Sequence, residues 1–344
     1  MQVENVDRLD TEQLSALVAL IEAATRADGV APLSEQVLLD ARDGLPSRTT
    51  TAPSTSSPHF LAYDGSHLAG YAHLERGPAG KTTGGGETGP AGESTEIGAT
   101  GGAATAEVVV DPAHRRHGIG TALVRALEDV LREGTLQIWS HGHLGVARAF
   151  ATSEDTTNVR TLWTMRRSLG ADAQPLPAAH LPEGFTTRHF VVGQDEDAWL
   201  RVNACAFAHH PEQGRMTRVD LDRRTAQSWF DTTGLILIED IRGPAPVLAA
   251  SHWTKVAPPQ DPQASPTEGE VYVVAVDPAY QGMGLGREVT VLGLAHLVER
   301  GVAEAFLYVE GDNTRAVSIY SELGFTRSAV DVMYSRVVHP PVPR

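Results

Sequence analysis

A glycine-rich segment that occurs twice constrains the fold of this chain more than any other feature. VVVDPAHRRHGIG at 108–120 and VAVDPAYQGMGLG at 274–286 agree at seven of thirteen positions, with a constant separation of 166 residues. Solenoid repeats recur every 20 to 50 residues or so, and this longer separation therefore indicates two duplicated domains. With 344 residues, 41% of them hydrophobic, the chain can form two cores.

Both copies sit in the same local pattern. A β-branched run ends at Asp-Pro, a loop with two glycines follows, and apolar residues then recur at helical spacing. These residues are Ile119, Leu123, Leu127 and Leu131 in the first copy. In the second, Leu285, Val289 and Leu292 follow much the same spacing, with His296 next in the row. The pattern predicts strand, loop and helix in each half.

Composition shifts mark the expected boundaries. The Pro- and Ala-rich stretch at 170–184 predicts a linker between an N-terminal domain at 1–169 and a C-terminal domain at 185–344. Within the first domain, the Gly- and Thr-rich run at 77–105 contains little that could be buried, and we expect a disordered insertion there.

Charge and hydropathy exclude several function classes. The formal net charge is −15 and the chain has no basic runs, which argues against nucleic-acid binding. No apolar run without charge is long enough to span a membrane, and the first residues are polar and acidic, so we expect neither a membrane span nor a signal peptide. We therefore expect a soluble, cytoplasmic protein that acts as a monomer on small molecules.

Cysteine and histidine usage argues against metal. Cys205 is the single cysteine, so no internal disulfide can form. The pairs His209-His210 and His141-x-His143 lack an acidic or thiol partner at ligand spacing. We expect no metal cofactor.

The glycine-rich loops suit a phosphate ligand. Glycines allow consecutive backbone amides to face a ligand, and the following helix adds positive potential at its N-terminus. Neither copy ends in the Gly-Lys-Ser/Thr of a nucleotide P-loop or keeps the GxGxxG spacing of a dinucleotide-binding loop. We therefore expect the loops to bind a pyrophosphate group.

With the preceding V-x-V-D-P, the loop resembles the acyl-CoA signature of the Gcn5-related N-acetyltransferases (GNAT). The resemblance implies an α/β (α+β) fold of two tandem GNAT domains, each a mixed, mostly antiparallel sheet flanked by helices, with acetyl-CoA as co-substrate. The implied coenzyme contacts in the second half are Val274, Ala275, Val276, Gln281, Gly282, Met283, Gly284, Leu285, Gly286 and Arg287. Those in the first half are Val108, Val109, Val110, Arg116, His117, Gly118, Ile119, Gly120 and Thr121.

The segment AFLYVEGDNTRAVSIYSELGF at 305–325 predicts a strand, an Asp-Asn helix start and a short helix that ends at Gly324. It is similar to the closing segment of GNAT domains, in which an asparagine and the following helix contact the coenzyme and a tyrosine lies near its sulfur. The residues concerned are Asn313, Thr314, Arg315, Ala316, Val317, Ser318 and Tyr320. The first half has no such ending, and we expect it to be non-catalytic.

Further segments, among them RVNACAFAHHPEQGRMT (201–217) and SHWTKV (251–256), resemble the mycothiol synthase family of actinobacteria along nearly the whole chain. That family acetylates the cysteinyl amine of cysteinyl-glucosaminyl-inositol with acetyl-CoA, which yields mycothiol and CoA. The implied acceptor contacts are Glu35, Glu212, Lys255, Glu270 and Tyr308. Glu35 belongs to the N-terminal half, which suggests that both halves contact the acceptor.

Acetyl transfer to an amine requires a base, a polarised carbonyl and an acid. An α-amino group has a reference pKa of about 7.7 to 8.0 and is mostly protonated at neutral pH. We expect Glu270 to act as the base, a backbone N–H within 274–276 to polarise the carbonyl, and Tyr320 to protonate the thiolate.

Two alternatives remain open at this point. The chain could acetylate another small amine, or it could be a sensor that binds acyl-CoA in both loops without turnover. Retention of Glu270, Asn313 and Tyr320 in one half favours catalysis over sensing.

Overall fold

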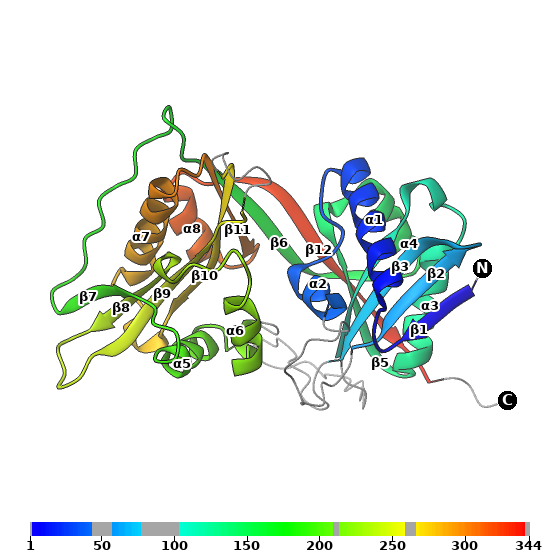
Figure 1. Cartoon of the computed structure of the whole chain (residues 1–344), viewed down its shortest axis with the longest axis horizontal. Coiled ribbons are helices and arrows are strands. Elements are labelled where there is room, and N and C mark those ends of the chain that lie inside the picture. Colours follow the sequence, from blue (N-terminus) through cyan, green and yellow to red (C-terminus); the bar gives the residue numbers. More distant parts are fainter. Residues whose placement is uncertain (1, 43–56, 77–102, 209–212, 259–265, 341–344) are drawn as a thin grey trace, which may run out of the picture. The chain divides into compact units, whose positions relative to one another are not determined.

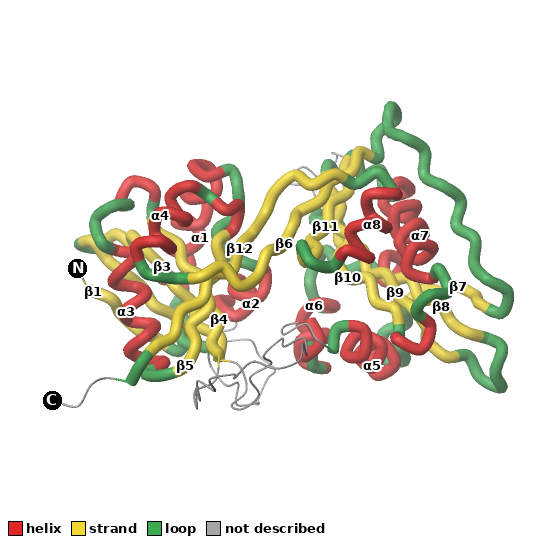
Figure 2. The backbone as a smooth tube through the Cα atoms, turned by 180° about the vertical axis from the view of Figure 1, so that it is seen from behind, coloured by secondary structure: helices red, strands yellow, loops and turns green. Residues whose placement is uncertain are grey.

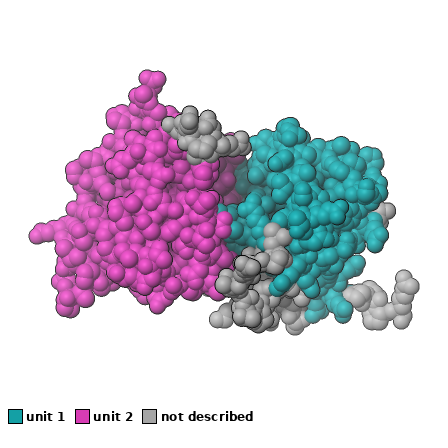
Figure 3. Space-filling model, viewed as in Figure 1, with its two compact units in different colours: residues 1–161, 330–344 teal, residues 162–329 magenta. Residues whose placement is uncertain are grey.

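The computed structural model describes residues 2–42, 57–76, 103–208, 213–258 and 266–340. It divides the chain into two compact units, residues 1–161 with 330–344 and residues 162–329 (Figure 3). Among the helices of these ranges, none combines the length and apolar character needed to cross a bilayer.

Unit 1 is a sheet with helices on both faces (Figure 1). Its strands, in spatial order, are β1 (Gln2–Val6), β2 (His59–Asp64), β3 (His67–Arg76), β4 (Ala103–Val110), β5 (Gly134–Ser140) and β12 (Thr326–Val338). Its helices are α1 (Thr11–Asp28), α2 (Glu35–Arg42), α3 (Ile119–Leu131) and α4 (Gly145–Ser153), with a short 3-10 turn, η1 (Pro112–His114), after β4. Only β4 and β5 run parallel; the other described neighbours are antiparallel.

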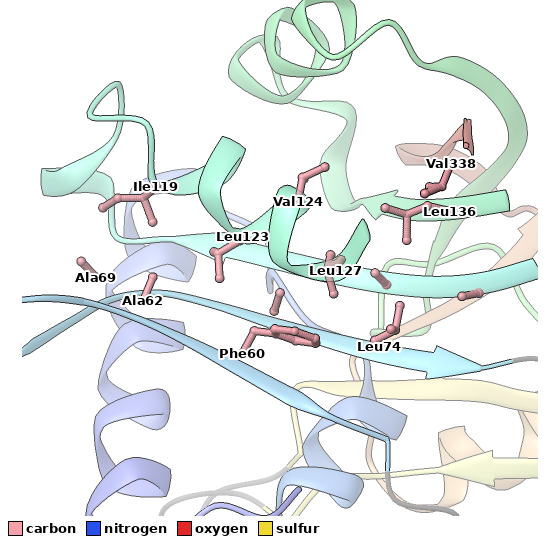
Figure 4. Close-up of a cluster of buried hydrophobic side chains, with 13 residues drawn as sticks. Phe60, Ala62, Ala69, Leu74, Ile119, Leu123, Val124, Leu127, Leu136 and Val338 are labelled. Atoms are coloured by element: carbon pink, nitrogen blue, oxygen red, sulfur yellow. The ribbon is translucent and has the colours of Figure 1, made fainter. Parts of the chain in front are cut away.

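Two apolar layers hold unit 1 together. The helical spacing of Ile119, Leu123 and Leu127 gives α3 one buried face, which packs on the sheet beside Phe60 and Leu136 (Figure 4). The opposite face of the sheet is covered by α1 and α2. The residues buried there include Leu17, Leu20, Val37, Leu61, Tyr71 and Val109.

Unit 2 repeats the architecture. Its strands, in spatial order, are β6 (Thr157–Ser168, of which residues 162–168 belong to this unit), β11 (Glu304–Glu310), β10 (Glu268–Val276), β9 (Val247–Lys255), β8 (Leu235–Asp240) and β7 (Phe185–His189). Its helices are α5 (Glu196–Ala206), α6 (Arg218–Thr225), α7 (Leu285–Glu299) and α8 (Thr314–Glu322). Here β10 and β11 form the parallel pair.

In unit 2, α5 and α6 bury Trp199 and Leu221 against one face of the sheet, beside Trp253 of β9. Helices α7 and α8 lie on the other face (Figure 2). Leu294 of α7 and Leu323, which directly follows α8, belong to the apolar cluster buried there. The fold class predicted from the sequence, two GNAT-type α/β domains with mixed sheets, is confirmed.

The boundaries of the two units differ from those of the domains expected at 1–169 and 185–344. From residue 162 onward β6 pairs with β11, whereas the chain returns at its end to place residues 332–338 of β12 beside β5. Residues 330–344 therefore belong to unit 1. The segment expected to be a linker, 170–184, belongs to unit 2, where the N–H of His180 donates to Glu288 at 2.6 Å.

The C-terminal boundary expected for the disordered insertion, residue 105, was wrong. Residues 103–105, assigned to the disordered run 77–105, begin strand β4, and Ala104 is buried in the core beneath α3. The small side chains of this stretch fit a strand that is covered on one face. Residues 77–102 lie outside the described ranges.

Candidate active site

Strand β10 separates from its parallel neighbour. Pairing between β10 and β11 runs from Glu268 opposite Glu304 to Glu270 opposite Phe306, whereas β10 continues to Val276. Residues 271–276 keep β9 as their neighbour on the other side. Their second edge offers backbone N–H and C=O groups to an extended ligand such as pantetheine.

A β-bulge sits at the point of separation. The register of β10 against β9 shifts at Tyr272, so that Glu270 pairs with Lys255 and Val273 with Trp253. Lys255 and Trp253 are two residues apart in β9 and share one face of the sheet. The bulge therefore brings Glu270 to the face of Val273, under α5 and α6.

Cationic and aromatic groups surround Glu270. The Nζ of Lys255 lies 3.9 Å from a carboxylate oxygen of Glu270, whose side chain is only 13% exposed. The same ammonium lies over the rings of Trp229 and Tyr272, 4.9 and 5.1 Å from their centroids. Arg224 donates to the hydroxyl of Tyr272 at 2.8 Å. Glu270 is thus a largely buried carboxylate that faces the Lys255 ammonium.

The loop after β10 has the backbone of an anion site. Asp277 accepts a hydrogen bond from the N–H of Ala279 at 2.9 Å, which fixes the turn. Gly282 and Gly284 have φ values of 86° and 82°, in the left-handed region that favours glycine. Gly284 caps α7 without a side-chain hydrogen bond. The first amides of α7 and its dipole can therefore receive a phosphate.

Helix α8 brings Tyr320 to the same neighbourhood. Tyr320 and Val274 of β10 both pack against the apolar cluster formed by α7, α8 and β11. A Cβ placed on Gly286 would lie 3.6 Å from Val276 and 3.9 Å from Ile319. The loop, the separated strand and α8 therefore meet at one place.

The surroundings of Tyr320 suit a proton donor. Burial raises the pKa of Tyr320 to about 12, and its ring meets that of Phe325 edge to face at 5.9 Å. At neutral pH the phenol keeps its proton. Asn313 caps α8 by accepting from the N–H of Ala316 at 3.1 Å, as its place before the helix predicts.

Of the other residues expected to contact the acceptor, the structure describes Tyr308 and Glu35. Tyr308 lies on β11 with 50% of its surface exposed, two residues from Phe306, and their rings meet edge to face at 6.0 Å. Glu35 is the first residue of α2 in unit 1. Glu212 lies outside the described residues.

Unit 1 has the same loop on a less open strand. Pairing of β4 with β5 continues to Glu107 opposite Trp139, which leaves only residues 108–110 beyond it. Against β3, the register of β4 shows no shift from Val110 to Ala104 within the described strands. The described part of β4 therefore has no bulge, and only residues 108–110 extend past the parallel pairing, compared with residues 271–276 in unit 2.

A pocket of about 760 Å³ nevertheless follows the loop of unit 1. It is lined by residues 108–110, Arg116, Gly118 and Gly120, as expected for a coenzyme contact, and also by Tyr334. Tyr334 lies on β12 and reaches this unit because the end of the chain pairs with β5. Residue 334 falls within the C-terminal domain expected from the sequence, 185–344, so the sequence alone did not place this tyrosine beside the first loop.

A buried charged cluster lies at the fork between β4 and β5. His141 contacts Glu107 at 3.5 Å and Asp331 at 3.1 Å, and Glu107 also accepts from the N–H of Ser34 at 2.6 Å. Burial by itself would lower the pKa of His141, but the Asp331 and Glu107 carboxylates outweigh it and raise the pKa to about 10. His141 directly follows β5, and its imidazolium joins β4, through Glu107, to β12, through Asp331. In unit 2, the equivalent strands β10 and β11 have already separated at this point.

Family comparison agrees with this geometry. The model of the acetyltransferase (GNAT) family matches residues 33–151 and 227–325, which include both loops. Two solved structures share the fold. A GCN5-related N-acetyltransferase from Sphaerobacter thermophilus has a TM-score of 0.63 and 22% identity, and the match covers 99% of this chain and 97% of that one. A tandem GNAT protein from the clavulanic acid biosynthesis pathway has a TM-score of 0.64 and 16% identity, and the match covers 99% of this chain and 100% of that one. The fold and the site thus define an acetyl-CoA-dependent acetyltransferase of the GNAT class.

Curated relatives narrow the assignment within this class. The chain is 47% identical to the mycothiol acetyltransferase of Thermomonospora curvata over 95% of both chains. It is 44% identical to that of Geodermatophilus obscurus over 97% of both. The chain belongs to the mycothiol acetyltransferase family.

Proposed function

We propose that this chain transfers the acetyl group of acetyl-CoA to the cysteinyl amine of cysteinyl-glucosaminyl-inositol, forming mycothiol and CoA. The observation that carries the choice of acceptor is the identity of 44–47% to proteins named mycothiol acetyltransferase along 95–97% of the chain. The geometry of unit 2 supports the chemistry of the transfer.

Acetyl-CoA binds along the open edge of β10. Its pantetheine pairs with the backbone of residues 274–276, and its pyrophosphate lies on the amides of 281–287, with α8 from Asn313 to Ser318 beside it. Gly282 and Gly284, both at positive φ, leave these amides unobstructed. The equivalent loop of unit 1 binds a second coenzyme without turning it over.

Glu270 acts as the general base. The acceptor ammonium must lose a proton before its nitrogen can attack the thioester carbon, and the Glu270 carboxylate accepts this proton directly or through one water. The bulge at Tyr272 supports this role, because it turns Glu270 toward the face covered by α5 and α6.

Attack forms the new C–N bond and places negative charge on the carbonyl oxygen. A backbone N–H on the open edge of residues 274–276 donates to that oxygen. When the C–S bond breaks, the electron pair leaves with sulfur, and the Tyr320 hydroxyl donates its proton to the thiolate. The pKa of Tyr320, raised by burial to about 12, keeps that proton available at the pH of the reaction.

The acceptor is a polyol that carries a cation, and carboxylates and hydrogen-bond donors should bind it. We assign Glu35, Glu212, Lys255, Glu270 and Tyr308 to these contacts. Lys255 is a donor close to the base, with its Nζ 3.9 Å from a carboxylate oxygen of Glu270. The enzyme acts as a cytoplasmic monomer on small molecules.

Mass spectrometry of the reaction of full-length protein with acetyl-CoA and synthetic cysteinyl-glucosaminyl-inositol tests the proposal. An acetylated amine product is expected, and the same mixture without protein serves as the control for uncatalysed transfer. Release of CoA thiol is an unsuitable signal because the acceptor itself carries a thiol. A folded protein that binds acetyl-CoA but yields no product would support a sensor, and transfer to other amines only would support a different acceptor.

A further inference from the structure

Three potential metal ligands from two separate segments of unit 1 converge beside the loop. His67 is the first residue of β3, Asp111 directly follows β4, and His114 ends η1. The Nε2 of His67 lies 2.7 Å from Oδ2 of Asp111, and the Nδ1 of His114 lies 3.3 Å from the same oxygen. One ligand atom from each residue lies within 4.8 Å of the other two.

The two carboxylate oxygens of Asp111 have different partners. Oδ1 accepts from the N–H of Ala113 at 2.9 Å, which orients the carboxylate and leaves Oδ2 for the imidazoles. Hydrogen bonding of this kind commonly supports a carboxylate that ligates a metal. The nitrogen of His114 that faces Oδ2 is itself buried.

Unit 2 has an equivalent aspartate, and its partner shows which kind of group this carboxylate pairs with. Asp277 occupies the equivalent place, and its Oδ1 accepts from Ala279 at the same 2.9 Å. Its Oδ2, however, pairs with the guanidinium of Arg201 at 2.7 Å. A largely buried carboxylate oxygen thus faces a permanent cation in unit 2 and two imidazoles in unit 1.

We propose that His67, Asp111 and His114 bind one divalent cation of the zinc class. Two imidazole nitrogens and one carboxylate oxygen are ligands that Zn²⁺ and Co²⁺ favour. With metal–ligand bonds of about 2.0 to 2.2 Å, tetrahedral geometry separates ligand atoms by roughly 3.3 Å. The contact of His114 already has this length, and His67, whose side chain is 55% exposed, can turn to lengthen its own.

The cation joins two segments that the sequence separates widely. Asp111 and His114 belong to the turn that leads into the loop at 115–120, and His67 belongs to the β2–β3 hairpin. The metal therefore tethers the hairpin to the base of the loop and leaves its fourth position to water. The site does not depend on the proposed acetyl transfer.

Calorimetric titration of the chelator-treated full-length protein with ZnCl₂ tests this site. One Zn²⁺ per chain should bind, and His67→Ala and His114→Ala should each weaken binding by about tenfold or more. His189→Ala, which removes an exposed histidine at the end of β7, is the matched control and should bind as the wild type does. Circular dichroism shows whether each variant is folded.

Cobalt spectroscopy identifies the ligands. Co²⁺ in the wild type should give the visible absorption of a four-coordinate nitrogen and oxygen site, and the His67→Ala/His114→Ala protein should not. Equal Zn²⁺ binding by that double variant and the wild type, or no binding by either at micromolar concentrations, would overturn the proposal. Loss of binding in a His209→Ala/His210→Ala protein instead would overturn it too.

Discussion

Arg116 and Gly282 occupy equivalent positions in the two loops, and both have positive φ, 67° and 86° respectively. Duplication has thus kept the backbone conformation while the residue changed. A residue with a side chain in this region is strained by roughly 1 to 2 kcal/mol. Arg116 is exposed and lines the pocket of unit 1, and we propose that it contacts a phosphate there, a role for which that strain is tolerated.

Arg116→Gly should leave unit 1 as stable or raise its free energy of unfolding by up to about 1 kcal/mol, because relief of strain exceeds the added freedom of the unfolded chain. Gly282→Arg should lower the stability of unit 2 by about 1 to 2 kcal/mol, since no atom lies within 4 Å of the new Cβ and only backbone strain is added. Urea denaturation measures both. Marked destabilisation by Arg116→Gly would contradict the strain assignment.

Glu270→Gln should lower the turnover number by about 10²- to 10⁴-fold at pH 7, because the amide cannot accept the amine proton. The loss should shrink above pH 8 or so, where the amine increasingly loses its proton to water. Turnover measured from pH 6.5 to 9.5 checks both statements. Glu268→Gln, which removes an exposed carboxylate two residues earlier on β10, is the control; an equal loss there would exclude a special role for Glu270.

His141→Gln should lower the free energy of unfolding by about 3 kcal/mol at pH 7, because it leaves two buried carboxylates without their cation. The pKa of His141 rises from 6.5 to about 10 on folding, so its contribution is complete below pH 6.5 and is lost as pH rises toward 10. The difference between wild type and variant should therefore shrink over that interval. Denaturation at several pH values measures it, with His189→Gln as the control; a constant difference would contradict the assignment.

Local patterns in the sequence predicted much of this structure. The Asp-Pro turn, the glycines at positive φ and the helical spacing behind them depend on residues close together in the chain, and both loops formed as predicted. Asn313 as a helix cap and Gly324 at φ 86° have the same local origin.

Features that depend on strand register could not be predicted in this way. The bulge at Tyr272 is defined only by the partner residues of β9, and the placement of Tyr334 requires knowing that β12 pairs with β5. In the cluster of His67, Asp111 and His114, the first residue is 44 positions before the second in the chain, so ligand spacing gave no signal that the three converge.

The central claim is that the duplicated units divide the work, with acetyl transfer in unit 2 alone. Each unit has a tyrosine beside its coenzyme loop: Tyr320 on α8 in unit 2, and Tyr334 lining the pocket of unit 1. The most direct measurement is the turnover number of Tyr320→Phe and of Tyr334→Phe at saturating acetyl-CoA. We predict a loss of about one to three orders of magnitude for Tyr320→Phe and wild-type turnover for Tyr334→Phe; loss confined to Tyr334→Phe would contradict the account.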